Sequence, residues 1–441
     1  MAHEEAKILS LSAFDARRAG EVDPAIRDLV ARRYRSFGGS SYLLYNEPLH
    51  VVRASGVFLY AQDGTPYLDA YNNVPSVGHC HPHVVEAMSR QAALLNTNTR
   101  YLYDIIYDYA ERLLATYPAA LGNVAFTCTG SESSDLALRI ARSATGGQGI
   151  VVTRNAYHGN TTAVAAISPS TGADVPIGID VRTVAPPAFG NKPTRKRIAQ
   201  FAEDVAAAFA DLKRHGIRPA AFICDSIFAS DGIYADPPGF LVQAAGAARA
   251  AGALYVADEV QPGFGRTGSH MWGFQRHGVE PDLVILGKPM GNGLPVAGVV
   301  AKPDILAAFS KSSGYFNTFG GSPVAAATGL AVLEVIENEG LMENASRVGA
   351  YLSGGIRKLA ATHGKISDVR GAGLYVGVEF RDAAGQPDPH TAQFVVNDLR
   401  RQHVLIGTSG TGHILKIRPP LCFSTDHADQ MLAAMANALA A

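Results

Sequence analysis

Between residues 124 and 286 the chain alternates short apolar runs with alanine-rich stretches of helical character. The apolar runs are residues 124–126, 150–152, 220–224, 253–257 and 283–286, and helices are expected over 132–144, 202–215 and 239–251. Strands that alternate with helices in this way form βαβ units, whose strands run parallel and are covered by helices. The alternation therefore predicts an α/β fold built on a mostly parallel sheet.

Two of these runs lead into side chains that can do chemistry. The run 253–257 is followed directly by Asp258, and the run 283–286 is followed after one glycine by Lys288. Ligands of open α/β sheets bind at the carboxyl ends of the strands. A lysine there can form a Schiff base with an aldehyde cofactor, and a carboxylate beside a ring nitrogen keeps that nitrogen protonated. We expect Asp258 and Lys288 to hold the two ends of a pyridoxal phosphate ring, although alone they would more often be a strand cap and a loop lysine.

Three further stretches fit such a cofactor. Gly130 and Ser131 stand between a predicted strand and a predicted helix, where backbone N–H groups bind phosphate; the alternative is an ordinary serine cap. Tyr157 follows the run 150–152 and either stacks on a flat ring or belongs to the core. Thr318, in a glycine-punctuated loop, is a candidate second phosphate donor.

The segments outside the alternation predict a second domain. Residues 10–36 have the pattern of an exposed helical arm, and residues 51–68 have that of a β-meander. Other expected elements are a helix over 83–95, a long apolar helix from 322 to about 338, strands over 369–380 and 414–423, and helices over 391–402 and 426–439. We expect an N-terminal arm with the start of a small domain (1–60), a large cofactor-binding domain (61–325) and a C-terminal small domain (326–441).

Composition limits the classes of function. The chain has 441 residues, 47% of them hydrophobic and 17% charged, which suffices for a large core. A net charge of −1 without a strong charge run gives no support for binding nucleic acid or a membrane surface. The four cysteines are scattered, and no signal sequence or membrane-spanning stretch is apparent. A soluble cytoplasmic protein with free thiols is expected.

Three alternating histidines, His79, His81 and His83, raise the question of a zinc site. No carboxylate or further cysteine ligand stands near them in the sequence. Structural or helix-capping roles are therefore favoured, and no metal site is predicted.

Seven stretches taken together resemble the class III aminotransferase family of fold type I pyridoxal-phosphate enzymes. In chain order they are residues 78–82, 129–132, 157–159, 258–268, 287–288, 318–321 and 419–421. The likeness runs in family order from Val51 to Phe423. It implies the fold type I architecture, with a large α/β domain and a smaller C-terminal α+β domain, and pyridoxal 5'-phosphate as the cofactor.

By that resemblance, Lys288 is the Schiff-base lysine and Asp258 pairs with the pyridine nitrogen. The other implied cofactor-binding residues are Tyr157, which stacks on the ring, its neighbour His158, Gln261 near the ring hydroxyl, and Gly130 and Ser131 at the phosphate. Thr318 would reach the phosphate of the neighbouring subunit's cofactor. The resemblance therefore implies at least a homodimer with active sites at the subunit interface, and it leaves a tetramer open.

Two departures from the family pattern bear on the reaction. Transaminases of the family usually carry an arginine three residues before the Pro-Pro pair, as a bidentate clamp for a substrate carboxylate. Here that position is Lys416, a point charge that suits phosphate at least as well. The glutamate that masks this arginine in members using 2-oxoglutarate is replaced by Ser230. Resemblance to one branch, the ethanolamine-phosphate and phosphohydroxylysine phospho-lyases, is carried by residues 71–82, 95–102, 315–319 and 416–424.

The reaction implied is β-elimination of phosphate from a phosphorylated amino alcohol. Lys288 would remove a proton from the carbon that bears nitrogen, and phosphate would leave the next carbon where cations meet its charge. Phosphoethanolamine would give acetaldehyde, ammonia and phosphate. The residues expected at the substrate phosphate are Lys416 first, then Arg418 on the same strand face, with Asn72, Asn73 and Ser76 as hydrogen-bond donors.

Two alternatives stay open. One is a class III (omega-type) aminotransferase that acts on an amine with a keto acid acceptor, because some amine transaminases place their arginine elsewhere. The other is a non-catalytic cofactor-binding protein on the same fold, against which the intact pair Lys288 and Asp258 argues.

Overall fold

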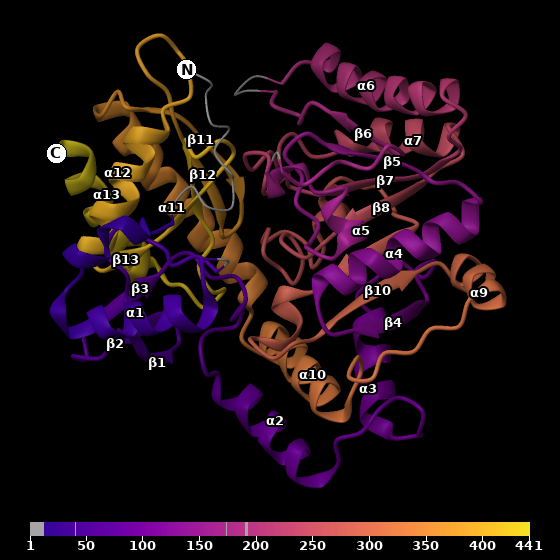
Figure 1. Cartoon of the computed structure of the whole chain (residues 1–441), viewed down its shortest axis with the longest axis horizontal. Helices are drawn as coiled ribbons and strands as arrows, with labels where there is room; N and C mark the ends of the chain where they lie inside the picture. Colours follow the sequence, from indigo (N-terminus) through magenta and orange to yellow (C-terminus); the bar gives the residue numbers. More distant parts are fainter. Residues whose placement is uncertain (1–12, 40, 173, 190–192) are drawn as a thin grey trace.

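The chain forms two parts that are joined by the long helix α10 (Pro323–Asn338) (Figure 1). A computed structural model describes residues 13–39, 41–172, 174–189 and 193–441. In Figure 1 the large part lies on the right, and the smaller part on the left carries both the first and the last helices, α1 and α13. Residues 10–12 of the expected N-terminal arm lie outside the described residues.

The large part is built on seven strands in the order β4-β10-β9-β8-β7-β5-β6. Their bounds are β4 Asn123–Thr127, β5 Gly149–Thr153, β6 Val181–Val184, β7 Pro219–Asp225, β8 Leu254–Asp258, β9 Leu283–Leu286 and β10 Ala297–Ala301. All neighbouring pairs from β9 to β6 are parallel, which confirms the mostly parallel sheet. β10 runs antiparallel to both β9 and β4, because only the short segment 287–296 joins it to β9 and a parallel return needs a longer crossover.

Helices cover both faces of this sheet. Along β5, Ile150 and Val152 belong to one apolar cluster and Val151 to another, as the two-residue period of a strand requires. α4 (Gly130–Thr145) packs into the first cluster, whereas α6 (Arg195–Arg214) and α7 (Leu241–Ala250) pack into the second. These three helices confirm the expected ones. α6 begins earlier than expected, at Arg195, because the Thr194 hydroxyl caps it.

The smaller part contains two four-stranded sheets. One has the order β1 (Val51–Ser55), β2 (Phe58–Ala61), β3 (Pro66–Asp69) and β13 (Val404–Leu405), which confirms the meander. The other has the order β11 (Ile366–Ala372), β12 (Tyr375–Phe380), β15 (Ile414–Ile417) and β14 (Gly407–Ser409). Because β13 pairs in parallel with β3, the meander belongs with the C-terminal residues, and the boundary expected at residue 60 falls inside the first sheet.

Several elements differ from expectation. The strand expected over 369–380 is the hairpin β11–β12, which turns at Gly373 with a φ of +55°. The strand expected over 414–423 ends at Ile417, because the prolines at 419 and 420 have no N–H to donate to a ladder. The helices α3 (Asp104–Leu114) and α11 (Leu341–Thr362) were not expected. The remaining helices are η2 (Ala16–Glu21), α1 (Pro24–Phe37), α2 (Pro82–Leu94), α5 (Thr162–Ala165), η3 (Pro169–Thr171), α8 (Gly273–Arg276), η4 (Lys288–Gly291), α9 (Pro303–Ser312), α12 (Pro389–Arg401) and α13 (Thr425–Ala440).

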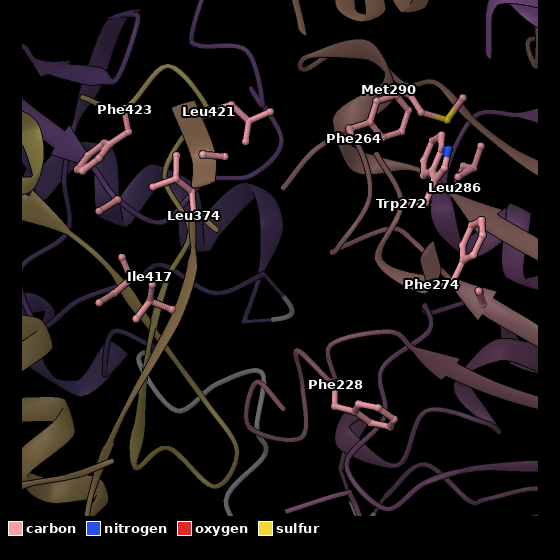
Figure 2. Packing of buried hydrophobic residues seen from close by; sticks show 14 of the residues in the cluster. Phe228, Phe264, Trp272, Phe274, Leu286, Met290, Leu374, Ile417, Leu421 and Phe423 are labelled. Carbon is pink, nitrogen blue, oxygen red and sulfur yellow. The ribbon is translucent and has the colours of Figure 1, made fainter. Parts of the chain in front are cut away.

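The two parts share one apolar cluster (Figure 2). Phe264, Trp272, Phe274, Leu286 and Met290 come from the large part, and Leu374, Ile417, Leu421 and Phe423 come from the small part. Arg266 of the large part is buried at this junction, and its Nη1 donates to the carbonyl oxygens of Leu374 (3.2 Å) and Pro419. These bonds fix the segment that follows β15 against the large part.

A close backbone approach predicts a difference in stability between two glycine variants. A Cβ on Gly349 of α11 would lie 2.0 Å from the carbonyl oxygen of Gly373, whereas nothing lies within 4 Å of a Cβ on Gly354 of the same helix. We expect Gly349→Ala to lower the free energy of unfolding by about 1–3 kcal/mol or more, because the backbone must move apart. Gly354→Ala should leave it equal or raise it by up to about 1 kcal/mol. Denaturation followed by circular dichroism measures both, and equal stabilities would contradict the close packing.

Candidate active site

The parallel strands β7, β8 and β9 end at the same edge of the sheet, and the candidate site is built there. The register pairs Asp225 with Asp258 and Asp258 with Ile285, so Lys288 follows just beyond this edge. Asp258 is 4% exposed. Its Oδ2 lies 2.6 Å from Nδ1 of His158, and since a carboxylate only accepts, this nitrogen carries the proton. Its Oδ1 accepts the backbone N–H of Val260 at 3.0 Å.

His158 is itself held from two sides. Its backbone N–H donates to the Ser168 hydroxyl at 3.0 Å, and its carbonyl oxygen accepts from the Ser134 hydroxyl at 2.8 Å. Its Nε2 is buried and has no hydrogen-bond partner among the described residues. The imidazole thus orients the Asp258 carboxylate through Nδ1, and its Nε2 remains without a hydrogen-bond partner among the described residues.

A cavity of about 190 Å³ adjoins this edge. The residues singled out from the sequence that line it are Tyr157, Ser230, Gln261, Lys288, Lys416 and Arg418. The other lining residues are Leu44, Tyr71, Ser170, Ile406, Gly407 and Thr408. The structure therefore brings the expected cofactor lysine together with both cations expected at the substrate phosphate.

Three cationic side chains meet in this cavity. Burial, with a smaller contribution from Arg418, lowers the pKa of Lys288 to about 8. Burial and the same arginine lower the pKa of Lys416 to about 7. Within the described ranges neither lysine has a hydrogen-bond or ion-pair partner. Arg418, by contrast, donates from Nη1 to Oε1 of Gln261 at 2.5 Å and lies 4.7 Å from the centre of the Tyr71 ring.

Two carboxylates lie close to these cations. Asp225 accepts two backbone N–H groups of the following loop, at 2.8 and 3.0 Å, and burial together with Asp258 raises its pKa to about 7. Asp231 accepts from the Thr153 hydroxyl at 2.6 Å, and burial raises its pKa to about 6. These bonds hold the loop 226–232 that delivers Ser230 to the cavity.

The N-terminus of α4 supplies backbone donors. The Thr129 hydroxyl accepts the N–H of Glu132 at 3.2 Å, and the Glu132 carboxylate accepts the N–H of Thr129 at 2.9 Å. The cap is therefore Thr129 and not Ser131, which corrects the alternative of a serine cap. Gly130 and Ser131 occupy the first two helical positions, whose N–H groups have no acceptor within a helix. The Ser131 hydroxyl donates to Oδ1 of Asn160 at 2.9 Å.

Two glycines let backbone crowd this helix end. A Cβ on Gly287 would lie 3.1 Å from Cα of Gly130. A Cβ on Gly159, whose φ is +144°, would lie 2.5 Å from the hydroxyl oxygen of Ser131. The segments that carry Lys288 and His158 thus press against the first turn of α4, and the helix end belongs to the same site.

Four residues predicted to contact the substrate or a neighbouring subunit do not line the cavity. The three expected substrate donors bond elsewhere: Asn72 to Asp69 (2.9 Å), Asn73 to Gln261 (2.8 Å) and Ser76 to the carbonyl oxygen of Pro289 (3.4 Å). The donors of all three side chains therefore already have local acceptors. Thr318 lies exposed on a loop, and its contact with a neighbouring subunit stays a prediction.

The three alternating histidines pair with three different carboxylates. His79 lies 2.7 Å from Asp69, His81 lies 2.9 Å from Glu339, and His83 lies 2.6 Å from Glu334. The ring nitrogens therefore point to separate places, as structural histidines do. Among the described residues no cluster of three or more His, Cys, Asp or Glu side chains is placed to hold a metal ion. No helix in the described ranges is long and apolar enough to cross a bilayer.

Part of the cavity wall has no signal in the sequence. Leu44 comes from the N-terminal segment, and Ile406 and Gly407 come from the segment after β13. The pairing of β13 with β3, far away in the sequence, fixes the chain that leads into Ile406 and Gly407 (Figure 1). Tyr71, by contrast, could be suspected from the sequence, because it begins a loop that is dense in polar and aromatic residues.

Known proteins resemble this chain over most of its length. The sequence model of the family described as Aminotransferase class-III matches residues 44–439. The chain is 38% identical over 431 residues to alanine–glyoxylate aminotransferase 2-like of Drosophila melanogaster, covering 94% of this chain and 87% of that protein. It is 35% identical over 439 residues to ethanolamine-phosphate phospho-lyase homolog 1 of Caenorhabditis elegans, covering 93% of each. A solved phospholyase from Arthrobacter in complex with phosphoethanolamine has a TM-score of 0.91 at 41% identity, covering 94% of this chain and 100% of that one.

These matches confirm the fold type I architecture and imply pyridoxal phosphate as the cofactor. The site fits that group: a carboxylate oriented by His158, an amine at Lys288 and the glycine-crowded first turn of α4 would hold its ring nitrogen, aldehyde and phosphate. The bound cofactor supplies an electron sink for the pair released at the substrate carbon.

The pairing of His158 with Asp258 predicts a change in cofactor affinity. His158→Leu removes a donor to a buried carboxylate, and hydrogen bonds to charged groups contribute roughly 1.5–3 kcal/mol. We expect cofactor binding to weaken about 10- to 100-fold, measured by titrating the visible absorbance of the bound cofactor. His83→Leu is the matched control, because its partner Glu334 lies on the surface. An equal loss in both variants, or none in His158→Leu, would contradict this role.

Proposed function

The chain belongs to the class III aminotransferase family of pyridoxal-phosphate enzymes, and from this premise we propose that it is a phospho-lyase. The proposed reaction is β-elimination of phosphate from a small phosphorylated amine, with phosphoethanolamine as the substrate. The observation that carries the proposal is the meeting of Lys416 and Arg418 with Lys288 in one cavity of about 190 Å³.

The charges in the cavity suit a substrate with one dianionic end. Lys416 on β15 and Arg418 just after this strand both line the cavity, and each can donate hydrogen bonds to phosphate oxygens. The lining also includes the apolar residues Leu44 and Ile406, which offer no counter-charge to a second anionic group. The Arthrobacter phospholyase, which resembles this chain along 94% of its length, is in complex with phosphoethanolamine.

The residues of the chain then have separate tasks. Lys288 takes the proton from the carbon that bears nitrogen, and its lowered pKa of about 8 favours the neutral amine that this step needs. Asp258, held by His158, keeps the ring nitrogen of the cofactor protonated. Gln261 orients Arg418 through the 2.5 Å hydrogen bond, and Arg418 and Lys416 meet the charge on the leaving phosphate.

The second candidate is an omega-type aminotransferase that transfers the amine to a keto acid. It is favoured by the relative from Drosophila melanogaster, which is named as an aminotransferase, and by Arg418, whose guanidinium can clamp a carboxylate. Against it, Ser230 lines the cavity where the sequence pattern of 2-oxoglutarate enzymes calls for a glutamate, and Nη1 of Arg418 already donates to Gln261.

We also propose a homodimer. Leu94, Leu102 and Phe319 are 78%, 90% and 73% exposed, and such large apolar side chains rarely gather on the surface of a monomer. The segments that carry Leu102 and Phe319 lie together, because the Tyr103 hydroxyl donates to the carbonyl oxygen of Gly321 at 2.7 Å. Thr318 stands in the same surface, as a contact with a neighbouring subunit requires. The cytoplasmic location stays a prediction.

Incubation with phosphoethanolamine in the absence of any keto acid tests the function. We expect release of phosphate and acetaldehyde at a rate that pyruvate or 2-oxoglutarate does not change. Lys288→Ala should lose both this activity and the visible absorbance of the bound cofactor. Strict dependence on a keto acid, with amino-acid product and no free phosphate, would favour the aminotransferase instead.

Lys416→Ala separates substrate binding from cofactor binding. Removing one cation from the substrate phosphate should raise the KM for phosphoethanolamine about 10- to 100-fold, since charge-assisted hydrogen bonds contribute roughly 1.5–3 kcal/mol. The dissociation constant of the cofactor should change much less, because Lys416 lies on β15 and the cofactor groups lie on the large part. Equal losses of both affinities would count against this assignment.

A further inference from the structure

Loss of phosphate from carbon needs a proton as well as cations, if the proposed function holds. When the C–O bond of a phosphate monoester dianion breaks, both bonding electrons stay on the oxygen. The departing group is then the strongly basic phosphate trianion, unless a proton reaches that oxygen as the bond breaks. A general acid near the leaving group would supply this proton to the dianion.

Lys416 is placed where such an acid is needed. Its neighbours on the two adjacent strands are both glycines, Gly377 on β12 and Gly407 on β14, so no side chain of the sheet stands beside it on its face. It lines the same cavity as Lys288, and it is 8% exposed. In the part of the chain that the structure describes, its ammonium donates to no acceptor, so its N–H groups are free for a substrate.

We propose that Lys416 is the general acid of the elimination and protonates the bridging oxygen as phosphate leaves. The C–H bond at the carbon bearing nitrogen breaks and its proton moves to Lys288; the electron pair ends in a new C=C bond. The C–O pair goes to the bridging oxygen, which takes a proton from Nζ of Lys416. Hydrogen phosphate departs and Lys416 is left as a neutral amine, so charge and atoms balance without an oxidant or a reductant.

The charged groups around Lys416 suit this task. Arg418, two residues further along the chain, and Lys288 after β9 disfavour its ammonium, whereas Asp225 at the end of β7 and Asp231 in the following loop favour it. Burial is the largest cause that lowers its pKa to about 7, Arg418 and Lys288 lower it further, and the two aspartates oppose the shift. Near neutral pH both the ammonium and the neutral amine are therefore populated, as an efficient general acid requires. An arginine at this position would stay charged and could not act as an acid.

A pair of esters that differ only in the leaving group separates acid catalysis from binding. Phosphoethanolamine needs a proton on its leaving group, whereas 2-aminoethyl sulfate releases sulfate, a very weak base that needs none. In the holoenzyme, Lys416→Arg keeps a cation but removes the acid. We expect the ratio of kcat for the phosphate ester to kcat for the sulfate ester to fall about 100-fold, within the usual range for general acid catalysis.

The wild-type enzyme gives a second measurement that needs no variant. Above about pH 7, where Lys416 loses its proton in the free enzyme, the ratio of kcat/KM for the phosphate ester to that for the sulfate ester should fall as pH rises. Proton removal by Lys288 is common to both esters, so its titration cancels in the ratio. A ratio that does not change with pH, together with equal effects of Lys416→Arg on both esters, would overturn the acid role of Lys416. In that case Lys288 would return the proton it removed to the leaving phosphate.

Phosphate binding gives a readout that does not depend on turnover. Inorganic phosphate added to the holoenzyme at about pH 8, one unit above the pKa of about 7, should draw a proton onto Lys416. Calorimetry in buffers of different ionisation enthalpy should therefore detect proton uptake in the wild type and its loss in Lys416→Arg, with phosphate still bound. Equal uptake in both proteins would contradict the proposal. If the wild type eliminates neither ester but aminates a keto acid, the proposed function fails; if it releases phosphate without these effects, only the acid role fails.

Discussion

The parallel register of β7, β8 and β9 is the constraint on which the rest of the site depends. Because Asp225 lies directly opposite Asp258, both carboxylates stand at one edge of the sheet, and the turn after β9 brings Lys288 to them. A slip of one residue would send Asp258 to the other face of the sheet and away from His158. Burying a cation costs desolvation energy, which nearby carboxylates partly offset. The same register therefore also helps to stabilise Lys416 and Arg418 in the cavity.

The features that could be predicted from the sequence are those written in short stretches of chain. Alternating apolar runs and helices gave the central sheet, because strand and helix periods are local properties. Asp258 and Lys288 were predictable because each directly follows such a run, and the edge at which parallel strands end is the same for all of them. The family pattern then added Gln261 and the importance of Lys416, neither of which has a local signal.

The features that could not be predicted depend on contacts between distant segments or on competition between local acceptors. Ile406 follows β13, which joins β3, and Leu44 lines the same cavity from far away in the chain; no local pattern reveals either placement. Asn72 and Asn73 stand in a donor-rich loop, but Asp69 and Gln261 already accept their amides. A polar loop beside a site is therefore weak evidence for ligand contact, because buried polar groups bond first to whatever acceptor the fold supplies.

The division of the site between two parts of the molecule explains why one fold can serve two reactions. The groups that fit the cofactor lie on the large part, whereas the cations proposed to meet the substrate phosphate, Lys416 on β15 and Arg418 just after it, lie on the small part. Arg266 joins the two, since its hydrogen bonds to the carbonyl oxygens of Leu374 and Pro419 fix the chain next to Arg418. A change on β15 can thus alter which group leaves or is exchanged without disturbing Asp258 and its partner, so the reaction is decided away from the residues that hold the cofactor.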